Sequence, residues 1–452
     1  MMRGVRSTLV MFGLFLALGG YAYFIESERP PASEAEANAQ AFGFEEDDIT
    51  ELQVIADNGD VTTLERTAGE DGSWSISSPV EVDADDTTAS SIAGGLASLE
   101  IQRVVEAESA DLTAFGLSDP TIDVGFRTAD DTVLRHLLIG DATPTGGDRY
   151  AKTDDGGRVF LVASHLESTF NRTTFDLRDK TVLDFERLDV DGLVLATADG
   201  TIRLDKADGS WRMAEPWDAR ADFGVVEGIV GRIGSAEMTS IEREATNEAD
   251  ADSEPNGLDA ARVTVTVDLG SASASLLVGG EAPDGAVYAR DASRDGLVFT
   301  IEAGLVADLE RPADTYRDKD LFTFRPFNAT RLEVNRDGDT ATFEKADTDE
   351  GSTAWRRVPP GADVDQSAIG DLLAQLSALR AESFMDSRAG TGVDTPIAAF
   401  FVDFDDGEDV VTIGRTGDDT YGVHGDEPGA ALLDTRAVDD ALDALDALDP
   451  ES

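Results

Sequence analysis

The feature that most constrains the fold is an internal repeat. Phe115–Phe185 contains, in order, FGLSDP, the alternating run TIDVGF, an apolar run ending LLIG, then RYAK, VFLV and LRDKTVLDF. The same order returns at 256–324 as NGLDAARVTVTV, LLVG, VYAR, VFTI and YRDKDLFTF, and more loosely at 391–434 as TGVDTP, AAFFVDF, VTIG, TYGV and ALLD. Self-similarity at a fixed period indicates repeated structural units, so the sequence predicts three copies of one domain.

A tryptophan marks each copy, with a proline five residues later. The tryptophans are Trp74, Trp211 and Trp355, spaced 137 and 144 residues apart, and the prolines are Pro79, Pro216 and Pro360. As an exposed series these rings could stack on sugars. Each occupies the same place after a turn, however, which favours a core anchor in each repeat.

A helix with an apolar period of 3.6 residues is predicted after each tryptophan, with Asp85, Asp222 and Asp365 as N-caps. Second helices are expected near 164–171, 303–310 and 435–448. Glycines 140, 279 and 414 end the central apolar strand of each copy and are expected to allow a turn, and Gly116 and Gly257 are expected to adopt positive φ.

The strands run in series, without regular β-α-β alternation, which predicts an α+β fold with mostly antiparallel sheets. The predicted units span 47–185, 186–325 and 326–452. The third unit is divergent, lacks the LRDK tail and ends in a helix, as expected of a terminal repeat.

The N-terminal segment predicts a membrane anchor. Arg3 and Arg6 precede an apolar run at 8–25, and Glu26 and Glu28 follow it. The run is just long enough to cross a bilayer, and the charges place the N-terminus in the cytoplasm. We therefore expect residues 1–28 to be a single-pass anchor in the cytoplasmic membrane, 29–46 a flexible linker, and the remainder extracytoplasmic. A cleaved signal peptide is the alternative.

The segments RSTLVMFGLFLALGGYAYFIESERP, GLSDP, LLIGDATPTG and LRDKTVLDF resemble a bacterial family of membrane-anchored proteins, the domain of unknown function numbered 4340. The resemblance covers the anchor and the first two units well and the third weakly. It implies a partner among proteins associated with ABC transporters of the gliding-motility type. The family has no assigned activity, so the resemblance assigns no site residues.

Composition narrows the classes of partner. The formal net charge is −56, with 92 acidic residues against 36 lysines and arginines. Such a field repels nucleic acid and anionic lipid and is expected to be a solvated acidic surface. The acidic runs at 83–86, 248–257 and 403–409 do not match the spacing of a calcium loop, so no metal site is predicted. There is no cysteine for disulfides or thiolate chemistry.

Catalytic signatures are absent from the sequence. His136, His165 and His424 lie far apart, and neither a phosphate-binding loop nor a nucleophile elbow occurs. No catalytic, cofactor-binding or metal-binding residue is therefore predicted, and the protein is expected not to be an enzyme. Arg178 and Arg317, in LRDK and YRDK, are expected to pair with carboxylates at junctions between units.

These observations predict a membrane-anchored extracytoplasmic scaffold or accessory protein, acting by contact with other envelope or transporter proteins. The alternative is a module that binds cell-wall or surface polysaccharide, and an envelope hydrolase is the third choice.

Overall fold

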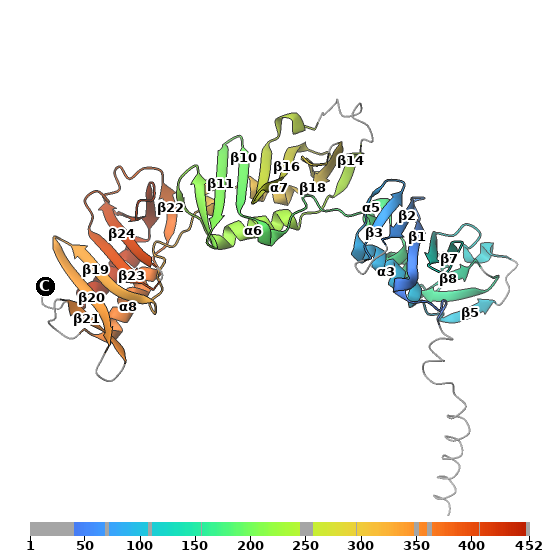
Figure 1. Ribbon diagram of the computed structural model, residues 1–452, viewed down its shortest axis with the longest axis horizontal. Helices are drawn as coiled ribbons and strands as arrows, with labels where there is room; N and C mark the ends of the chain where they lie inside the picture. Colours follow the sequence, from blue (N-terminus) through green and yellow to red (C-terminus); the bar gives the residue numbers. More distant parts are fainter. Residues whose placement is uncertain are drawn as a thin grey trace, which may run out of the picture. The chain divides into compact units, whose positions relative to one another are not determined.

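Three antiparallel sheets follow one another along the chain, one for each predicted repeat (Figure 1). The computed structural model describes residues 40–67, 72–106, 111–154, 156–244, 256–294, 296–347, 352–358, 364–405 and 407–448. The chain divides after Lys180 into two compact units, of which the first contains one sheet and the second contains two. The predicted α+β class, with three repeats and antiparallel sheets, is confirmed.

The first sheet has nine strands in the order β4-β3-β2-β1-β6-β7-β8-β9-β5. Their bounds are β1 Ile49–Ile55, β2 Val61–Arg66, β3 Trp74–Ser78, β4 Val82–Asp83, β5 Arg103–Glu106, β6 Ile122–Thr128, β7 Arg135–Ala142, β8 Asp148–Thr153 and β9 Val159–Ala163.

The second sheet repeats this order with β13-β12-β11-β10-β15-β16-β17-β18-β14, and the third has eight strands, β21-β20-β19-β23-β24-β25-β26-β22. The second comprises β10 Gly192–Thr197, β11 Gly200–Ala207, β12 Ser210–Glu215, β13 Ala219–Arg220, β14 Ser240–Glu244, β15 Val263–Leu269, β16 Ala272–Glu281, β17 Val287–Asp291 and β18 Leu297–Ile301. The third comprises β19 Ala329–Arg336, β20 Asp339–Asp347, β21 Thr353–Val358, β22 Ala381–Met385, β23 Ala398–Phe404, β24 Gly407–Thr416, β25 Asp419–His424 and β26 Ala430–Leu433.

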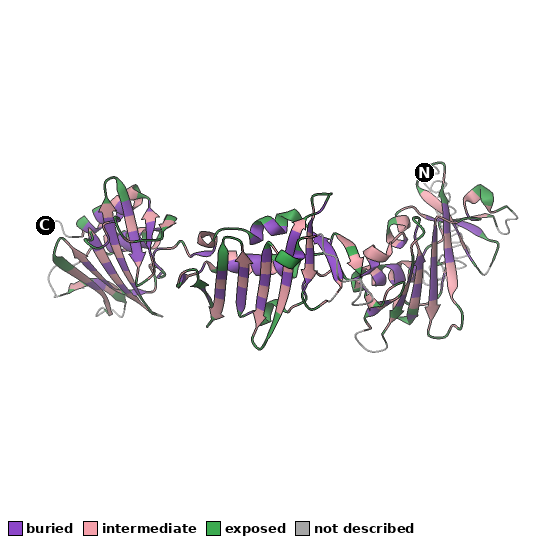
Figure 2. Ribbon diagram, turned by 90° about the horizontal axis from the view of Figure 1, so that it is seen from above, coloured by how far each residue is buried: buried purple, intermediate pink, exposed green. Residues whose placement is uncertain are grey.

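A helix crosses one face of each sheet and joins the two edges. In the first repeat it leads from β4 at one edge to β5 at the other, and the chain then returns through β6 beside β1. Buried residues alternate along the strands (Figure 2), because successive side chains point to opposite faces and only one face is covered by the helix.

The crossing helices are α3 (Asp86–Ala97), α6 (Phe223–Gly234) and α8 (Gln366–Ser377), each of twelve residues. All three predicted N-caps are confirmed. Asp85 accepts from the Thr88 amide at 2.9 Å, Asp222 from the Val225 amide at 3.0 Å, and Asp365 from the Ser367 amide at 2.8 Å. A carboxylate there satisfies free amides and interacts favourably with the positive end of the helix dipole.

The second helices also form close to the predicted places. They are α4 (Leu166–Phe170) with α5 (Thr174–Leu177) in the first repeat, α7 (Ala303–Leu309) in the second and α9 (Thr435–Asp446) in the third. Short 3-10 turns also occur in the first two repeats, namely η2 (Glu46–Asp48), η3 (Thr113–Phe115), η4 (Arg187–Asp189), η6 (Leu258–Ala260) and η7 (Ala313–Tyr316).

The marker tryptophans are core residues, as predicted. Trp74 and Trp211 are each 3% exposed and Trp355 is 8% exposed. The Trp211 indole nitrogen donates to Glu227 at 2.9 Å, so its polar atom is satisfied inside the second repeat. Rings buried in this way cannot stack on an external sugar. Pro360 lies outside the described residues.

Each repeat begins several residues earlier than the sequence predicted. The segment 40–44, placed in the flexible linker, bonds instead to the end of the first crossing helix: the Ala41 amide donates to Leu99 at 2.8 Å, and Phe42 is buried. The same contact recurs in the second unit, where the Val182 amide donates to Ala236 and the Leu321 amide to Leu379, both at 3.0 Å. The predicted linker is therefore wrong at 40–46. This stretch has no strand period, but burial of the Phe42 ring in the core of the first repeat fixes its position.

The role assigned to three glycines is also wrong. Gly140, Gly279 and Gly414 lie within β7, β16 and β24 rather than at a turn. A Cβ atom on Gly279 would lie 2.2 Å from the Asn256 carbonyl oxygen, so glycine is needed for close approach of a loop to the strand. Gly116 and Gly257 do adopt positive φ, 67° and 73°, as predicted.

The predicted anchor at 8–25 and residues 1–39 in general lie outside the described part of the chain. Within the described ranges, no helix combines the length and apolarity needed to span a bilayer.

Candidate functional site

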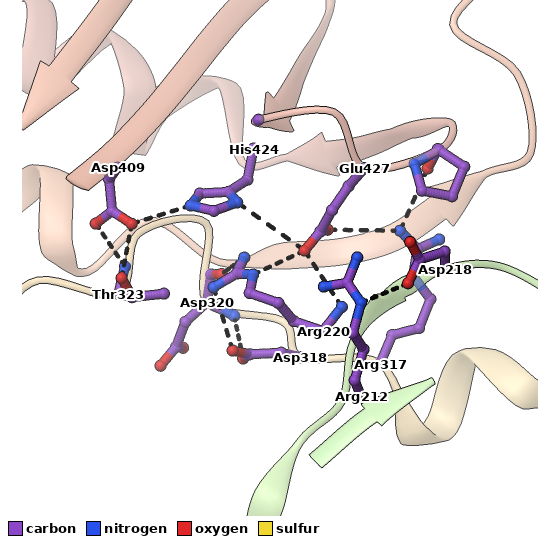
Figure 3. Close-up of polar contacts among 12 residues, drawn as sticks. Arg212, Asp218, Arg220, Arg317, Asp318, Asp320, Thr323, Asp409, His424 and Glu427 are labelled. Carbon is purple, nitrogen blue, oxygen red and sulfur yellow. Dashed lines mark hydrogen bonds and ion pairs between the residues drawn. The ribbon is translucent and has the colours of Figure 1, made fainter. Parts of the chain in front are cut away.

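The three histidines are not brought together. His136 contacts Asp123 at 2.7 Å on the first sheet, and His165 precedes α4 in the same unit. His424 ends β25 in the second unit, where it joins the group of charged side chains that Figure 3 shows. That group lies where the second and third repeats meet, and we call it the junction cluster: Arg220, Arg317, Asp318, Asp320, Thr323, Asp409, His424 and Glu427.

The acidic runs have structural roles where they are described. In the first, Asp85 caps α3, and Asp86 accepts from the Trp74 amide at 2.6 Å. The second lies almost entirely outside the described residues. The third supplies Asp409 to the junction cluster. Over the ranges that the structure covers, no group of histidine and acidic residues is arranged to hold a metal ion.

Asp409 on β24 anchors the segment that enters the third repeat. Its carboxylate is fully buried and accepts from the amides of Thr323 at 2.7 Å and Phe324 at 2.9 Å. The Thr323 hydroxyl donates at 2.6 Å, and His424 Nε2 lies 2.9 Å away on the other side. Burial raises the pKa of Asp409, but the hydrogen bonds from His424 and Thr323 outweigh it and hold this pKa below its usual value.

Glu427, in the loop between β25 and β26, connects the two repeats. It accepts from Arg220 Nε of the second repeat at 2.7 Å, and His424 Nδ1 lies 4.0 Å from the same carboxylate. Arg220 also donates to the Asp320 carbonyl at 2.7 Å and contacts Asp318 at 3.3 Å. The Arg220 guanidinium thus connects β13, the edge strand of the second sheet, to the segment containing Asp318 and Asp320 and to Glu427 of the third repeat (Figure 3).

Arg317, the arginine of YRDK, lies inside this junction and is only 4% exposed. Its guanidinium stacks 3.8 Å from the Phe384 ring centroid and 5.5 Å from that of Trp217. The nearest carboxylates are at ion-pair distance, Asp314 at 3.9 Å and Glu427 at 4.0 Å. Burial lowers the pKa of Arg317, while Glu427 opposes that shift. The expected pairing of Arg317 with carboxylates at a junction agrees with these distances.

Arg178, the matching arginine of LRDK, is 5% exposed in the first unit. Its main chain bridges to Ala84, as that of Arg317 does to Ala221, so the motif continues the edge of its own sheet. The motif is therefore part of the repeat as well as a connection.

The cluster encloses a cavity of about 20 Å³, which is room for a single water molecule. Its carboxylates are bound to arginine, histidine or backbone amides, and the Glu427–Arg220 pair crosses from the third repeat to the second. Such an arrangement fixes two domains in one orientation, because opening it would leave buried charges uncompensated. Sequence reasoning missed Arg220, Asp409 and Glu427, since single charged residues in so acidic a chain carry no distinguishing pattern.

Comparison with known proteins gives one match. The family model described as Domain of unknown function (DUF4340) matches residues 74–210 and 211–399, which is well over half of the chain. The two matched segments begin at 74 and at 211, the first two marker tryptophans, in agreement with the repeat. No curated protein and no solved structure matches the chain.

Proposed function

Because the chain belongs to the DUF4340 family, whose domain it repeats, we propose that it is a non-catalytic, membrane-anchored scaffold or accessory protein. In this proposal residues 8–25 cross the cytoplasmic membrane once and the repeats lie outside the cytoplasm. They act by binding other envelope proteins, in particular a transporter complex of the ABC type associated with gliding motility.

The junction cluster is the observation that carries the proposal. A protein that positions its partners needs domains held in a fixed relation, and the Arg220–Glu427 pair at 2.7 Å joins two repeats in this way. The side chains of this pair are only 19% and 14% exposed, so water and salt screen the interaction less than at an open surface. The marker tryptophans no longer support the alternative of polysaccharide binding, because all three rings are buried.

The charge pattern supports the proposed orientation. Arg3 and Arg6 precede the apolar run, and Glu26 and Glu28 follow it. Reporter fusions after Arg29 and at the C-terminus are expected to be active only outside the cytoplasm. A C-terminal reporter active in the cytoplasm would contradict the topology.

The scaffold role is tested by affinity purification of the full-length chain from detergent-solubilised membranes. We expect defined transporter or envelope proteins to copurify with the wild type. The Glu427→Arg variant should lose them, and the double variant Arg220→Glu/Glu427→Arg should recover part of them by restoring an opposite-charge pair. Partial recovery is expected because Arg220 also contacts Asp318.

Two results would oppose the scaffold proposal. Copurification that is unaffected by Glu427→Arg would show that a fixed junction is not needed. Saturable binding of purified cell-wall polysaccharide, with no protein partner recovered, would favour the alternative function.

A further inference from the structure

Arg317 is attached to the second repeat by its main chain and to the third repeat by its side chain. The main chain forms a bridge with Ala221, the residue that follows β13 at the edge of the second sheet. The next amide, of Asp318, donates to the Arg220 carbonyl at 3.0 Å. The guanidinium lies 3.8 Å from the ring centroid of Phe384, in β22 of the third repeat. One residue therefore spans the junction.

The surroundings of the Arg317 guanidinium are aromatic. Besides Phe384, the Trp217 ring lies 5.5 Å away, in the loop between β12 and β13 of the second repeat. Phe384 packs against the core of the third repeat, which fixes the position of its ring. A guanidinium over an aromatic face is attracted by the ring quadrupole, most strongly where water is excluded. Arg317 meets that condition, because it is only 4% exposed.

Direct ion pairs contribute less to the contacts of Arg317 than to those of Arg220. The carboxylates of Asp314 and Glu427 lie 3.9 and 4.0 Å from the Arg317 guanidinium, beyond hydrogen-bond distance (Figure 3). The Pro428 carbonyl of the third repeat accepts a long hydrogen bond from Nη2 at 3.5 Å. Arg220, in contrast, donates to Glu427 at 2.7 Å. The same two repeats are therefore joined by a direct ion pair and, separately, by a stacked guanidinium.

The stacked contact should be insensitive to salt. The screening length in water falls from about 10 Å at about 0.1 M salt to about 3 Å at about 1 M, and buried charges are screened much less than exposed ones. Because the Arg317 side chain is 4% exposed, ions have little access to it. Added salt also relieves repulsion within a chain of net charge −56, so it should not push the two acidic repeats apart.

We propose that Arg317 holds the second and third repeats in one orientation, and that its stacking on Phe384 and Trp217 keeps this orientation from low to molar salt. Lysine cannot replace it, because an ammonium group is compact, strongly hydrated and without a planar face. The inference concerns the geometry of the molecule and goes beyond the proposed function, since it does not depend on any partner protein.

The test measures the distance between two spin labels on the full-length chain, which has no cysteine of its own. Gly228→Cys on α6 and Asp371→Cys on α8 place one label on each repeat. Both positions are exposed, and a Cβ atom at position 228 would have no neighbour within 4 Å. We expect one narrow distance distribution that is the same at about 0.1 M and at about 1 M sodium chloride.

Two matched pairs of variants isolate the stacking. Arg317→Lys and Arg212→Lys both keep the positive charge, but Arg212 is 53% exposed and pairs with Asp218 of its own repeat. Arg317→Lys should lose the single narrow distance, whereas Arg212→Lys should keep it. Phe384→Tyr retains an aromatic face and should keep the narrow distance, whereas Phe384→Leu retains only bulk and should broaden it.

Hydrogen exchange of the same variants separates a change of orientation from unfolding. Strands β10, β15, β23 and β24 should keep their wild-type protection, and if Arg317→Lys lowers it, the Phe384 pair decides. A narrow distance in both Arg317→Lys and Phe384→Leu, or a wild-type distance that broadens at molar salt, would overturn the proposal. Partners that still copurify with a variant of broad distance would leave the role of Arg317 in place and contradict the scaffold function instead.

Discussion

Replacing Asp409 by alanine should release the entering segment of the third repeat. The carboxylate is fully buried and is the acceptor for four donors, the Thr323 amide and hydroxyl, the Phe324 amide and the His424 ring. Alanine offers none of these acceptors and leaves the donors facing a small void. The consequence should be local, because the contacts lie within the third repeat and the segment that enters it.

The magnitude follows from the number of groups left without a partner. A buried polar group that loses its partner costs about 1–3 kcal/mol, and breaking a buried charged pair costs about 3–5 kcal/mol. Thr323 is exposed, so water can replace part of its loss. We therefore expect the third repeat to lose about 3 kcal/mol of stability.

Hydrogen exchange followed by mass spectrometry on the full-length chain resolves the repeats separately. A loss of about 3 kcal/mol corresponds to a protection factor lower by about a hundredfold in β19 and β24 at neutral pH. The strands of the first repeat serve as the internal control and should exchange as in the wild type. Asp409→Asn keeps the size of the side chain and one acceptor oxygen, so its protection factors should lie between those of the wild type and those of Asp409→Ala.

The pH dependence has a defined sign. The pKa of Asp409 is lower in the folded chain than its ordinary value of 3.8, so its contribution is complete above that value and is lost as the pH falls through the folded pKa. The difference in protection between wild type and Asp409→Ala should therefore be constant near neutrality and shrink below about pH 3.8. Unchanged protection at neutral pH, or a difference that persists undiminished into strong acid, would refute the reasoning.

Three further outcomes are expected. Trp74→Ala and Trp211→Ala should each destabilise their own repeat by about 3–5 kcal/mol, read by hydrogen exchange, and an unchanged repeat would contradict the core role. Asp222→Ala should cost about 1 kcal/mol through loss of the cap, with Asp222→Ser nearly neutral, as shown by the protection of α6. Sodium chloride from millimolar to molar should raise the melting temperature, since screening relieves the repulsion of a −56 chain; a sharp rise with millimolar calcium alone would indicate a specific cation site instead.

The parts of the fold that the sequence predicted are those with a local signal. The caps could be found because a helix start needs an acceptor at one position, as at Asp85 and Asp222. The buried tryptophans could be found because a large ring recurs in the same setting, and positive φ at Gly116 because it follows from a turn. Each of these features depends on a few neighbouring residues.

The parts that were missed depend on contacts between distant residues. Phe42 could not be assigned to the core, because only its packing with Phe126 and the stacking of Arg135 on its ring explain its place. Gly279 was assigned to a turn because the loop that approaches it lies more than twenty residues away. Asp409 and Glu427 were two carboxylates among 92, so their burial was visible only in three dimensions.

The strand order of each sheet has a consequence for synthesis of the chain. The central pair joins β1 to β6, with the crossing helix and β5 between them in the chain. Until residues 122–128 have been synthesised, one edge of β1 has no strand to pair with. The apolar side chains of Ile49, Leu52 and Val54 lie on this unpaired strand. An open strand edge of this kind is a template for pairing with other chains. Each of the three repeats therefore passes through an aggregation-prone interval during synthesis, and the length of that interval is set by the time that the ribosome needs to reach the strand that pairs with the open edge.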